Sequence, residues 1–214
     1  LCEGEPRAEK QFGGKARLSL TDKIKNGRLT VDQGIIAGCA GGMYDNIAEA
    51  AAILKNRGTG SGYFSLSVYP PSVPVNLELI QSGIQQSLLE SGALFKPCFC
   101  GPCFGAGDVP ANDALSIRHT TRNFPNREGS KPGDGQLSGV ILMDARSIAA
   151  TARNHGVLTS AADVDYDAPS PAERRFDASV YDKRVYRGFG HPQPDAPLQY
   201  GPNIAEWPAI PALS

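Results

Sequence analysis

The stretch "GIIAGCAGGMYDNIAEAAAILKNRG" (residues 34–58) decides the fold of this chain. It opens with an apolar run, residues 34–40, that is typical of a buried strand. A pair of glycines then makes a turn, and residues 45–58 place apolar side chains at helical spacing. We expect Asp45 to be the N-cap of this helix and Gly58 to lie at its exit.

The alternation of strands and helices continues outward from this stretch. Further strands are predicted at residues 63–70, 93–99, 115–122 and 139–144, and further helices at 75–91 and 145–155. The helix at 75–91 carries an expected apolar stripe, which consists of Leu77, Ile80, Ile84 and Leu88. Asp144 is the expected cap of the last helix. The alternation predicts an α/β fold, a three-layer α/β/α arrangement around a mostly parallel sheet.

Composition divides the chain into three parts. Residues 1–31 are polar and in places basic, and we expect an N-terminal arm or linker there. Residues 32–167 hold the alternating pattern and form the expected α/β domain. Residues 168–214 are rich in proline and are expected to form an extended C-terminal linker packed on the domain. The chain begins with Leu rather than Met, as expected of a processed product or a piece of a longer protein.

The composition also excludes several classes of protein. With 21 Lys and Arg against 22 Asp and Glu, the formal net charge is -1, so no basic field is available for nucleic acid. The apolar runs are too short and interrupted for a membrane span. The 5 cysteines are an odd number, which argues against a secreted disulfide framework and favours a cytoplasmic location. In a reducing compartment such cysteines more often serve a metal or a reaction.

The segment "CFCGPCFGAGD" (residues 98–108) contains the pair Cys100 and Cys103, which has several interpretations. A thioredoxin-type redox pair opens a helix, but the glycines and the proline after Cys103 disfavour one. A zinc ribbon needs a second such pair, which the chain lacks. With Cys39 added, the thiolates suit a four-iron cluster that leaves one iron open. Spacing alone favours a simpler role for Cys39, that of a small buried apolar side chain.

Cys39, Cys100 and Arg122 each follow a predicted strand. In a parallel sheet the carboxyl ends of the strands line one edge, and ligands bind in the crevices there. We therefore expect these residues, which are far apart in the sequence, to converge on one rim.

Two motifs, in the order in which they occur, resemble the aconitase family of hydro-lyases. The segment "CFCGPCFGAGDVPANDALSIRHTTRNFPNREGSKPG" is similar to the family's cluster-binding region, where a CGPC-type pair precedes an "RNFxGR" stretch. Here that stretch is "RNFPNR", from Arg122 to Arg127. Upstream, "IAGCAGG" resembles the family's "GSCTNS" turn, and downstream "VYRGFGHPQPDAPLQYGPNIAEWP" is similar to the tail of the same domain. The resemblance spans residues 34–208.

The resemblance implies the fold of the family's iron–sulfur domain and a [4Fe-4S] cluster as cofactor. Matched motif by motif, the implied cluster ligands are Cys39, Cys100 and Cys103, and the implied carboxylate-binding residues are Arg122 and Arg127. Guanidinium groups match carboxylates with paired hydrogen bonds, which agrees with that role. Without the motif, arginines in a loop are more simply explained as solvated surface residues.

Departures from the family's motifs leave the substrate open. The family's "CTNS" is "CAGG" here, Thr121 stands where the family has Asn, and Asn126 stands where it has Gly. The lost polar groups would have tuned the cluster. The small carboxylic acid substrate is therefore either citrate or another hydroxy-carboxylic acid.

Enzymes of this family are longer than this chain, and the resemblance places their catalytic serine base in another domain. The implied function is the third, cluster-binding domain of an aconitase-type hydro-lyase, which reversibly dehydrates a hydroxy-carboxylic acid and is inactive alone. We assign no catalytic residue in this chain, and the implied partners are the remaining domains of the same enzyme. The alternative is a non-catalytic metal-binding or regulatory module on the same fold.

Overall fold

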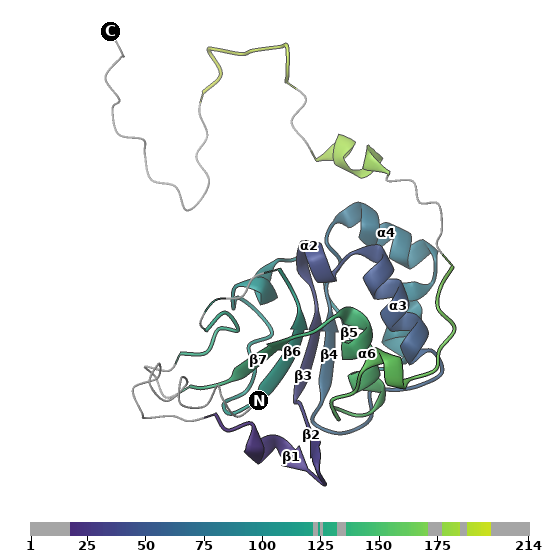
Figure 1. Cartoon of the computed structure of the whole chain (residues 1–214). Coiled ribbons are helices and arrows are strands. Elements are labelled where there is room, and N and C mark those ends of the chain that lie inside the picture. The colour runs from purple at the N-terminus through teal and green to yellow at the C-terminus, as the bar shows by residue number, and fades with distance from the viewer. Residues whose placement is uncertain are drawn as a thin grey trace. The chain divides into compact units, whose positions relative to one another are not determined.

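The computed structural model describes residues 18–121, 124, 126–131, 136–170, 177–184 and 188–197. The chain divides into two units, Leu1–Asp177 and Ala178–Ser214. The first unit holds the sheet and its helices (Figure 1), and the described part of the second holds the 3₁₀ helix η6 (Ala178–Lys183). Among the residues described, no helix has the length and apolar character that crossing a membrane requires. The expected packing of a C-terminal linker on the domain stays a prediction.

A parallel sheet is the centre of the first unit. In the described part of the chain its strand order is β5-β4-β3-β6-β7, and every neighbouring pair is parallel. These strands are β3 (Gln33–Ile36), β4 (Ser65–Val68), β5 (Leu94–Phe95), β6 (Leu115–His119) and β7 (Gly139–Leu142). The predicted α/β class with a parallel sheet is therefore confirmed. An antiparallel hairpin precedes the sheet and consists of β1 (Ile24–Lys25) and β2 (Arg28–Leu29), after the 3₁₀ turn η2 (Thr21–Lys23).

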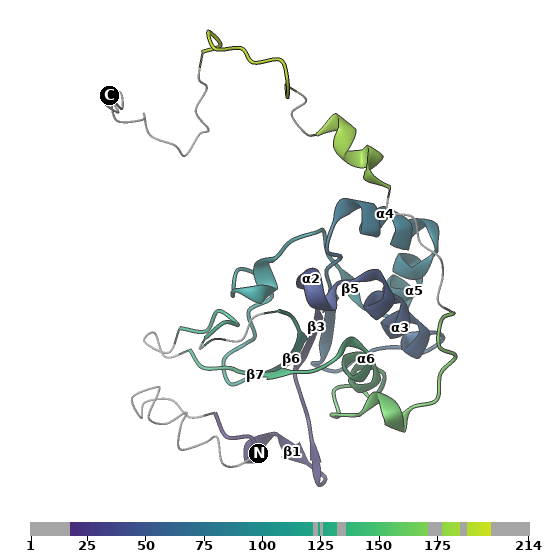
Figure 2. The same cartoon turned by 45° about the horizontal axis from the view of Figure 1, so that its top comes forward.

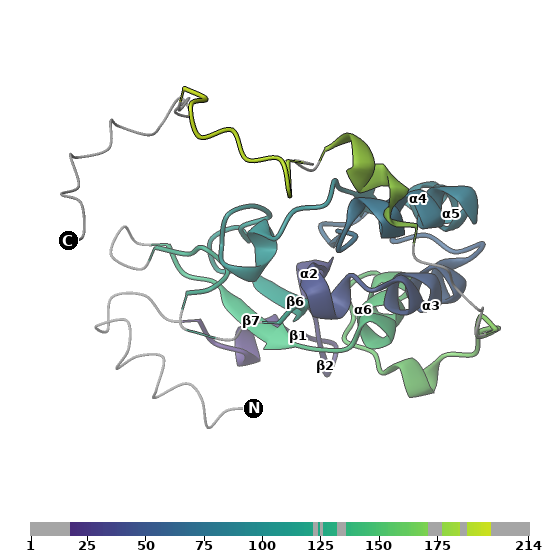
Figure 3. The ribbon, with the colours of Figure 1, turned by 90° about the horizontal axis from the view of Figure 1, so that it is seen from above.

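The α-helices of the described residues form a layer of their own. They are α2 (Gly38–Gly41), α3 (Tyr44–Leu54), α4 (Val73–Gln81), α5 (Ile84–Glu90) and α6 (Ala145–Arg153). Helices α3 and α6 lie side by side and pack extensively on each other (Figure 3). The strand side chains that share their buried apolar core include Ile36, Leu66, Val68, Leu115 and Ile117.

The alternate strand positions make a more polar face. Ser116 of β6 is the register partner of Gln33 of β3, and Arg118 lies two positions further along β6, so the three side chains point to the same face. Ser116 and Arg118 are fully buried. Residues 96–114, the connection from β5 to β6, contact this face through Pro102 and Asp108. The connection contains the 3₁₀ turn η3 (Gly101–Cys103).

The predicted helix at 75–91 is in fact two helices. Gly83 has φ +74°, which breaks the helix between α4 and α5. The break changes which side chains face the core, so Leu79 is fully buried whereas Leu77 and Ile80 are 41% and 51% exposed. Only the part of the predicted stripe that lies in α5, Ile84 and Leu88, packs in the core.

The predicted ends of helix α3 are wrong, because the backbone takes other turns there. Met43 is the N-cap and makes no side-chain cap, and Asp45 lies inside the first turn. The helix ends at Leu54, and Asn56, with φ +59°, takes the left-handed conformation that was expected of Gly58.

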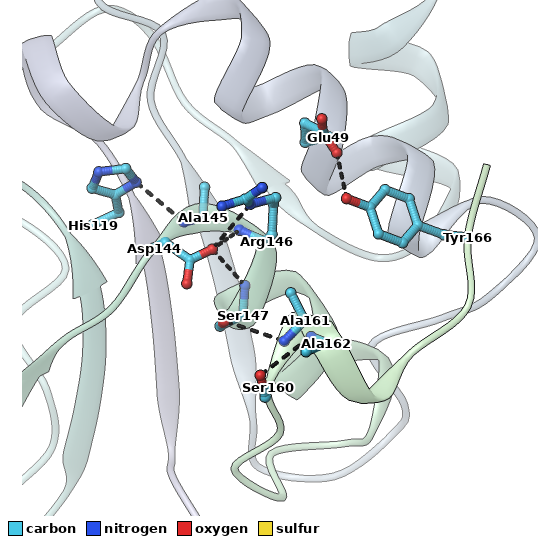
Figure 4. A network of polar contacts seen from close by, with 10 residues as sticks. All are labelled: Glu49, His119, Asp144, Ala145, Arg146, Ser147, Ser160, Ala161, Ala162 and Tyr166. Atoms are coloured by element: carbon cyan, nitrogen blue, oxygen red, sulfur yellow. Dashed lines mark hydrogen bonds and ion pairs between the residues drawn. The ribbon is translucent and has the colours of Figure 1, made fainter. Parts of the chain in front are cut away.

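The predicted cap of helix α6 is confirmed. Asp144 Oδ1 accepts hydrogen bonds from the backbone N–H of Arg146 at 3.0 Å and of Ser147 at 3.1 Å (Figure 4). Although burial raises the pKa of Asp144, these hydrogen bonds from Ser147 and the Arg146 cation bring it below its usual value. His119 Nδ1, at the end of β6, accepts the backbone N–H of Ala145 at 3.1 Å. The start of α6 is therefore held by its own cap and by the sheet.

Candidate functional site

The candidate site lies where the order of the sheet reverses, between β3 and β6. Ile36 pairs with His119 in the parallel register, so the chain leaves both strands at the same edge. Such a reversal opens a crevice at the carboxyl ends of the strands, and ligands of α/β proteins bind there. Helix α2, with Cys39, follows β3 at this point, and Figure 2 shows it at the end of that strand.

Helix α2 packs on the end of β6 with its backbone. The N–H of Ala37 donates to the carbonyl of His119 at 3.1 Å. A Cβ atom on Gly41 would lie 1.9 Å from that same carbonyl oxygen, so only glycine fits without a shift of the backbone. The "CAGG" sequence is therefore the one that lets α2 approach β6 so closely.

Cys39 and Cys103 both lie beside Thr121. Cys39 is exposed, and its Sγ lies 3.2 Å from Thr121 Oγ1. A Cβ atom on Gly38, which has φ +75°, would lie 2.7 Å from Cys103 Sγ and 3.8 Å from Thr121 Oγ1. The Cys103 thiol is therefore packed on the backbone that precedes Cys39. The alternative role of Cys39 as a buried apolar side chain is wrong.

Cys100 joins the same group through η3. The N–H of Cys103 donates to the Cys100 carbonyl at 3.1 Å, and the side chain of Cys100 contacts that of Cys103. Cys100 is exposed and Cys103 is 1% exposed. The pair thus lies in a single 3₁₀ turn and not at the start of an α-helix, which argues against a thioredoxin-type redox pair.

The Cys103 thiol is buried, and opposing interactions act on its pKa. Burial raises its pKa above the usual value, and its contact with Cys100 raises it further. A hydrogen bond from the backbone of Thr121 and the positive charge of Arg127 act in the opposite direction. Cys98 is half-buried, and burial raises the pKa of its thiol as well.

Arg127 is buried and only partly paired. It is 2% exposed, and its Nη2 donates to Thr120 Oγ1. Its Nε and Nη1 have no hydrogen-bond partner among the residues that the structure describes. Burial lowers its pKa, while Cys103 and Glu128 act to raise it. Buried N–H groups need an acceptor, so Arg127 is not the solvated surface residue of the simpler explanation, and it is equipped to bind an anion.

The other predicted carboxylate-binding residue, Arg122, lies outside the described residues. The departure at Asn126 has a plain backbone reason, because Asn126 has φ +55°. Glycine is the usual residue in this left-handed region, and asparagine is among the few others that enter it readily. Replacing the family's glycine with asparagine therefore keeps the turn that precedes Arg127.

Arg118 is a neighbour of this site that the sequence analysis missed. It is fully buried in β6 and donates to the backbone carbonyls of Pro102 at 2.9 Å and Asp108 at 3.0 Å. The available signal was a charged residue in the middle of the apolar strand "LSIRH", since arginine is rarely buried unless it is paired.

The side chains gathered at the site include thiols, which are the usual ligands of iron–sulfur clusters. Within the described residues, no group of three or more His, Cys, Asp and Glu side chains is arranged to hold one metal ion. Thiols are the side chains that bind Fe–S clusters, and a four-iron cube spaces its ligands more widely than one ion does. Cys39 and Cys100 are exposed and are connected through Cys103 and Thr121, so thiols are available on the rim.

Comparison with known proteins places the chain in a family. Residues 4–150 match the Aconitase family (aconitate hydratase). The chain is 31% identical over 131 residues to the 3-isopropylmalate dehydratase large subunit of Nitratidesulfovibrio vulgaris, which covers 61% of this chain and 31% of that protein. It is 33% identical over 112 residues to the 3-isopropylmalate dehydratase large subunit 2 of Pyrococcus furiosus, covering 52% of this chain and 29% of that protein.

A third relative is the 3-isopropylmalate dehydratase large subunit of Helicobacter hepaticus, 27% identical over 140 residues, or 64% of this chain and 31% of the relative. The chain thus spans less than a third of the length of these relatives. Hydro-lyases of the matched family generally use a [4Fe-4S] cluster. Because the family match takes in more than half of the sequence, this chain belongs to the aconitase family of hydro-lyase enzymes.

Proposed function

We propose that this chain is the cluster-binding domain of an aconitase-type hydro-lyase. The observation that carries the proposal is the position of Cys39 and Cys103 beside Thr121 at the switch point of the sheet, with Cys100 in contact with Cys103. In this proposal Cys39, Cys100 and Cys103 bind a [4Fe-4S] cluster. When bound, such a cluster supplies an open iron that acts as a Lewis acid toward a hydroxyl and a carboxylate.

The chain's own part in the reaction is to bind and orient the substrate. Buried Arg127 has two N–H groups without a partner among the described residues, and they can hold a carboxylate with paired, charge-assisted hydrogen bonds. We assign the same task to Arg122 from its place in the motif. The Thr121 hydroxyl shares a hydrogen bond with Cys39 Sγ, and this bond orients the thiol. No catalytic acid or base is assigned within this chain.

The proposed substrate is a small hydroxy-carboxylic acid. The matched family is described by aconitate hydratase and the relatives by 3-isopropylmalate dehydratase, so citrate-like and isopropylmalate-like acids are the candidates. Since the chain spans less than a third of those relatives, we propose that further domains or subunits complete the site. The 214-residue chain alone is expected to show no turnover of citrate, isocitrate or aconitate.

Anaerobic reconstitution with iron and sulfide tests the proposal. The chain should gain a broad visible absorption and an iron content of about four per chain, as a [4Fe-4S] cluster requires. Cys39→Ser, Cys100→Ser and Cys103→Ser should each abolish the absorption, whereas Cys98→Ser and Cys2→Ser should retain it. Loss of the chromophore in Cys98→Ser together with its survival in Cys39→Ser would show that the ligand assignment is wrong.

The same experiment addresses the alternative of a non-catalytic metal-binding or regulatory module. The close packing of Gly41 on His119 favours that alternative, because it leaves no room for a side chain at position 41, where the family's motif has a polar residue. A cluster that assembles in the chain but supports no dehydration in the complete protein would select the module over the enzyme.

A further inference from the structure

We propose that Arg118 is a positioning residue that clamps the cysteine turn onto the sheet and so sets the place of Cys103. The meaning of the clamp for catalysis rests on the proposed function, but the clamp itself concerns only residues of this chain. Arg118 lies in β6, on the polar face of the sheet, and is fully buried beneath the connection that carries η3.

The hydrogen bonds of Arg118 hold the turn at two points. Its Nη1 donates to the Pro102 carbonyl at 2.9 Å, directly before Cys103, and its Nη2 donates to the Asp108 carbonyl at 3.0 Å. One guanidinium therefore fixes both ends of the segment 102–108. Backbone carbonyls are the acceptors, so the contact constrains the path of the chain and not the orientation of a side chain.

The guanidinium of Arg118 is itself held by side chains of β3 and β6. Its Nε donates to Ser116 Oγ at 3.0 Å, and its Nη2 also donates to Gln33 Oε1 at 3.2 Å. Ser116 Oγ donates to the same Gln33 oxygen at 2.8 Å. Because Gln33 and Ser116 are register partners in β3 and β6, the clamp is anchored on the two central strands of the described sheet.

Asp108 is held from two further sides. Gln33 Nε2 donates to its carbonyl at 3.1 Å, and Tyr69 Oη donates to its Oδ2 at 2.8 Å. Asp108 has φ +48°, an unusual conformation for a residue other than glycine, so these contacts hold a backbone that would otherwise relax. The far end of the cysteine turn is thus fixed by β3, by β6 and by Tyr69, the residue after β4.

Arginine suits this position although burial of its charge is costly. Burial lowers the pKa of Arg118 to about 10, and the neighbouring Arg127 cation lowers it in the same direction, while Glu128 and Asp108 oppose the change. The group still carries its charge at neutral pH. A planar fork holds one N–H group toward Pro102 and another toward Asp108 in a fixed geometry, whereas an ammonium group is a point charge on a flexible stem.

The clamp has a direct consequence for the thiols. Cys103 Sγ is packed so closely on Gly38 that a Cβ there would lie 2.7 Å away, and Cys39 is the next residue. If the turn lifted from β6, Cys103 would leave Gly38, and its distance from Cys39 would no longer be fixed. Arg118 therefore keeps the proposed ligands in register without touching a ligand itself.

The test is native-state alkylation of the 214-residue chain without a cluster, with Arg118→Lys as the variant. Cys103 is 1% exposed, so iodoacetamide reaches it only through local opening, and mass spectrometry gives the rate at each cysteine. Loss of one charged hydrogen bond should raise the Cys103 rate at least about tenfold. Arg153→Lys is the matched control, because Arg153 also bonds a carbonyl, that of Asp165, but on the exposed side of α6.

The result has to be specific to the turn. An equal rise at Cys98 and Cys103 would indicate general loosening, and an unchanged Cys103 rate would equally overturn the clamp. Ser116→Ala removes the acceptor of Nε and the hydrogen bond from Ser116 to Gln33 but leaves the guanidinium in place, and it gives a second, milder variant if Arg118→Lys does not fold. Its Cys103 rate should rise less than that of Arg118→Lys but above the wild-type rate, and a rate equal to wild type would overturn the proposal.

Cluster lifetime separates this inference from the proposed function. In reconstituted protein, Arg118→Lys should lose its visible absorption to an iron chelator several-fold faster than wild type. If the wild-type chain assembles no cluster, the proposed function fails while the alkylation result still decides the clamp. If both proteins hold the cluster equally well and Cys103 reacts equally slowly, the clamp is refuted and the proposed function stands.

Discussion

Cys39 Sγ and Thr121 Oγ1 lie 3.2 Å apart, although 82 residues separate them in the sequence. They meet because β3 and β6 are neighbours in the sheet and each residue follows the end of its strand. Cys103 lies beside Thr121 as well and contacts Cys100, so Cys39 and Cys100 are connected at this edge, whereas the expected convergence of Arg122 on the same rim stays a prediction. The topology of the sheet therefore builds this site, rather than any local sequence.

Gly38→Ala should destabilise the fold and displace Cys103. At φ +75° an alanine costs about 1–2 kcal/mol, and its Cβ would in addition lie 2.7 Å from Cys103 Sγ. We expect a loss of about 2–4 kcal/mol in the free energy of unfolding, measured with urea. Gly83→Ala is the control, because Gly83 has φ +74° but open space around its Cβ position. Equal losses in the two variants would show that the contact with Cys103 has no cost.

Leu79→Ala should cost far more than Ile80→Ala. Leu79 is fully buried, so its truncation should lower the free energy of unfolding by about 2–5 kcal/mol. Ile80 is 51% exposed, and its truncation should cost less than about 1 kcal/mol. Chemical denaturation of both variants measures the difference. A larger loss for Ile80→Ala than for Leu79→Ala would contradict the break at Gly83 and support the continuous helix and the stripe that the sequence predicts.

The segment 75–91 also shows which features of the fold the sequence alone does not predict. The apolar periodicity of residues 75–91 is real, but Gly83 interrupts the helix, and a periodic pattern does not reveal whether a glycine is tolerated or breaks it. The cap at Asp144 was predictable, because capping depends on residues adjacent in the sequence. The sequence therefore predicts a helix cap more reliably than it predicts which side of a helix faces the core.

The same distinction applies to the site. The parallel sheet and the placing of Cys39 after a strand follow from alternation and from the general geometry of parallel sheets. The partners of buried Arg118 could not be predicted, because they depend on the path of the connection over the polar face of the sheet. That path is set by hydrogen bonds from residues as distant in the sequence as Gln33 and Asp108.

Acidification should weaken the fold through His119. Burial lowers the pKa of His119 in the folded protein, with Asp144 opposing, and its Nδ1 accepts the N–H of Ala145 only when that nitrogen is unprotonated. Because the folded pKa lies below the unfolded value of about 6.5, the stability from neutral His119 is complete above that pH. It is lost as the pH falls from there through the folded pKa.

The measurement is the free energy of unfolding between about pH 7 and pH 5, compared with that of His119→Gln, whose amide oxygen can accept from Ala145 but does not titrate. The variant should show a shallower fall in stability with pH than the wild type. Identical slopes would mean that His119 has the same proton affinity in the folded and unfolded chains.

Arg127→Lys should impair the handling of a carboxylate substrate even though the charge is kept. Arg127 is 2% exposed, and its Nε and Nη1 have no partner among the described residues, so both are available to an acceptor that enters the site. An ammonium group cannot reproduce two parallel hydrogen bonds. Loss of a charge-assisted hydrogen bond, worth about 1.5–3 kcal/mol, should lower kcat/KM of the complete enzyme at least about tenfold.

Arg146→Lys is the matched control for that measurement. Arg146 is also an arginine near the carboxyl edge of the sheet, but its side chain is 55% exposed and its Nε pairs with Asp144 at 3.4 Å. Such a surface pair contributes little, so this variant should keep kcat/KM close to that of the wild type. Comparable kcat/KM values for Arg127→Lys and Arg146→Lys would place the carboxylate away from Arg127. The N–H groups of Arg127 that lack a partner among the described residues would then bind some other acceptor.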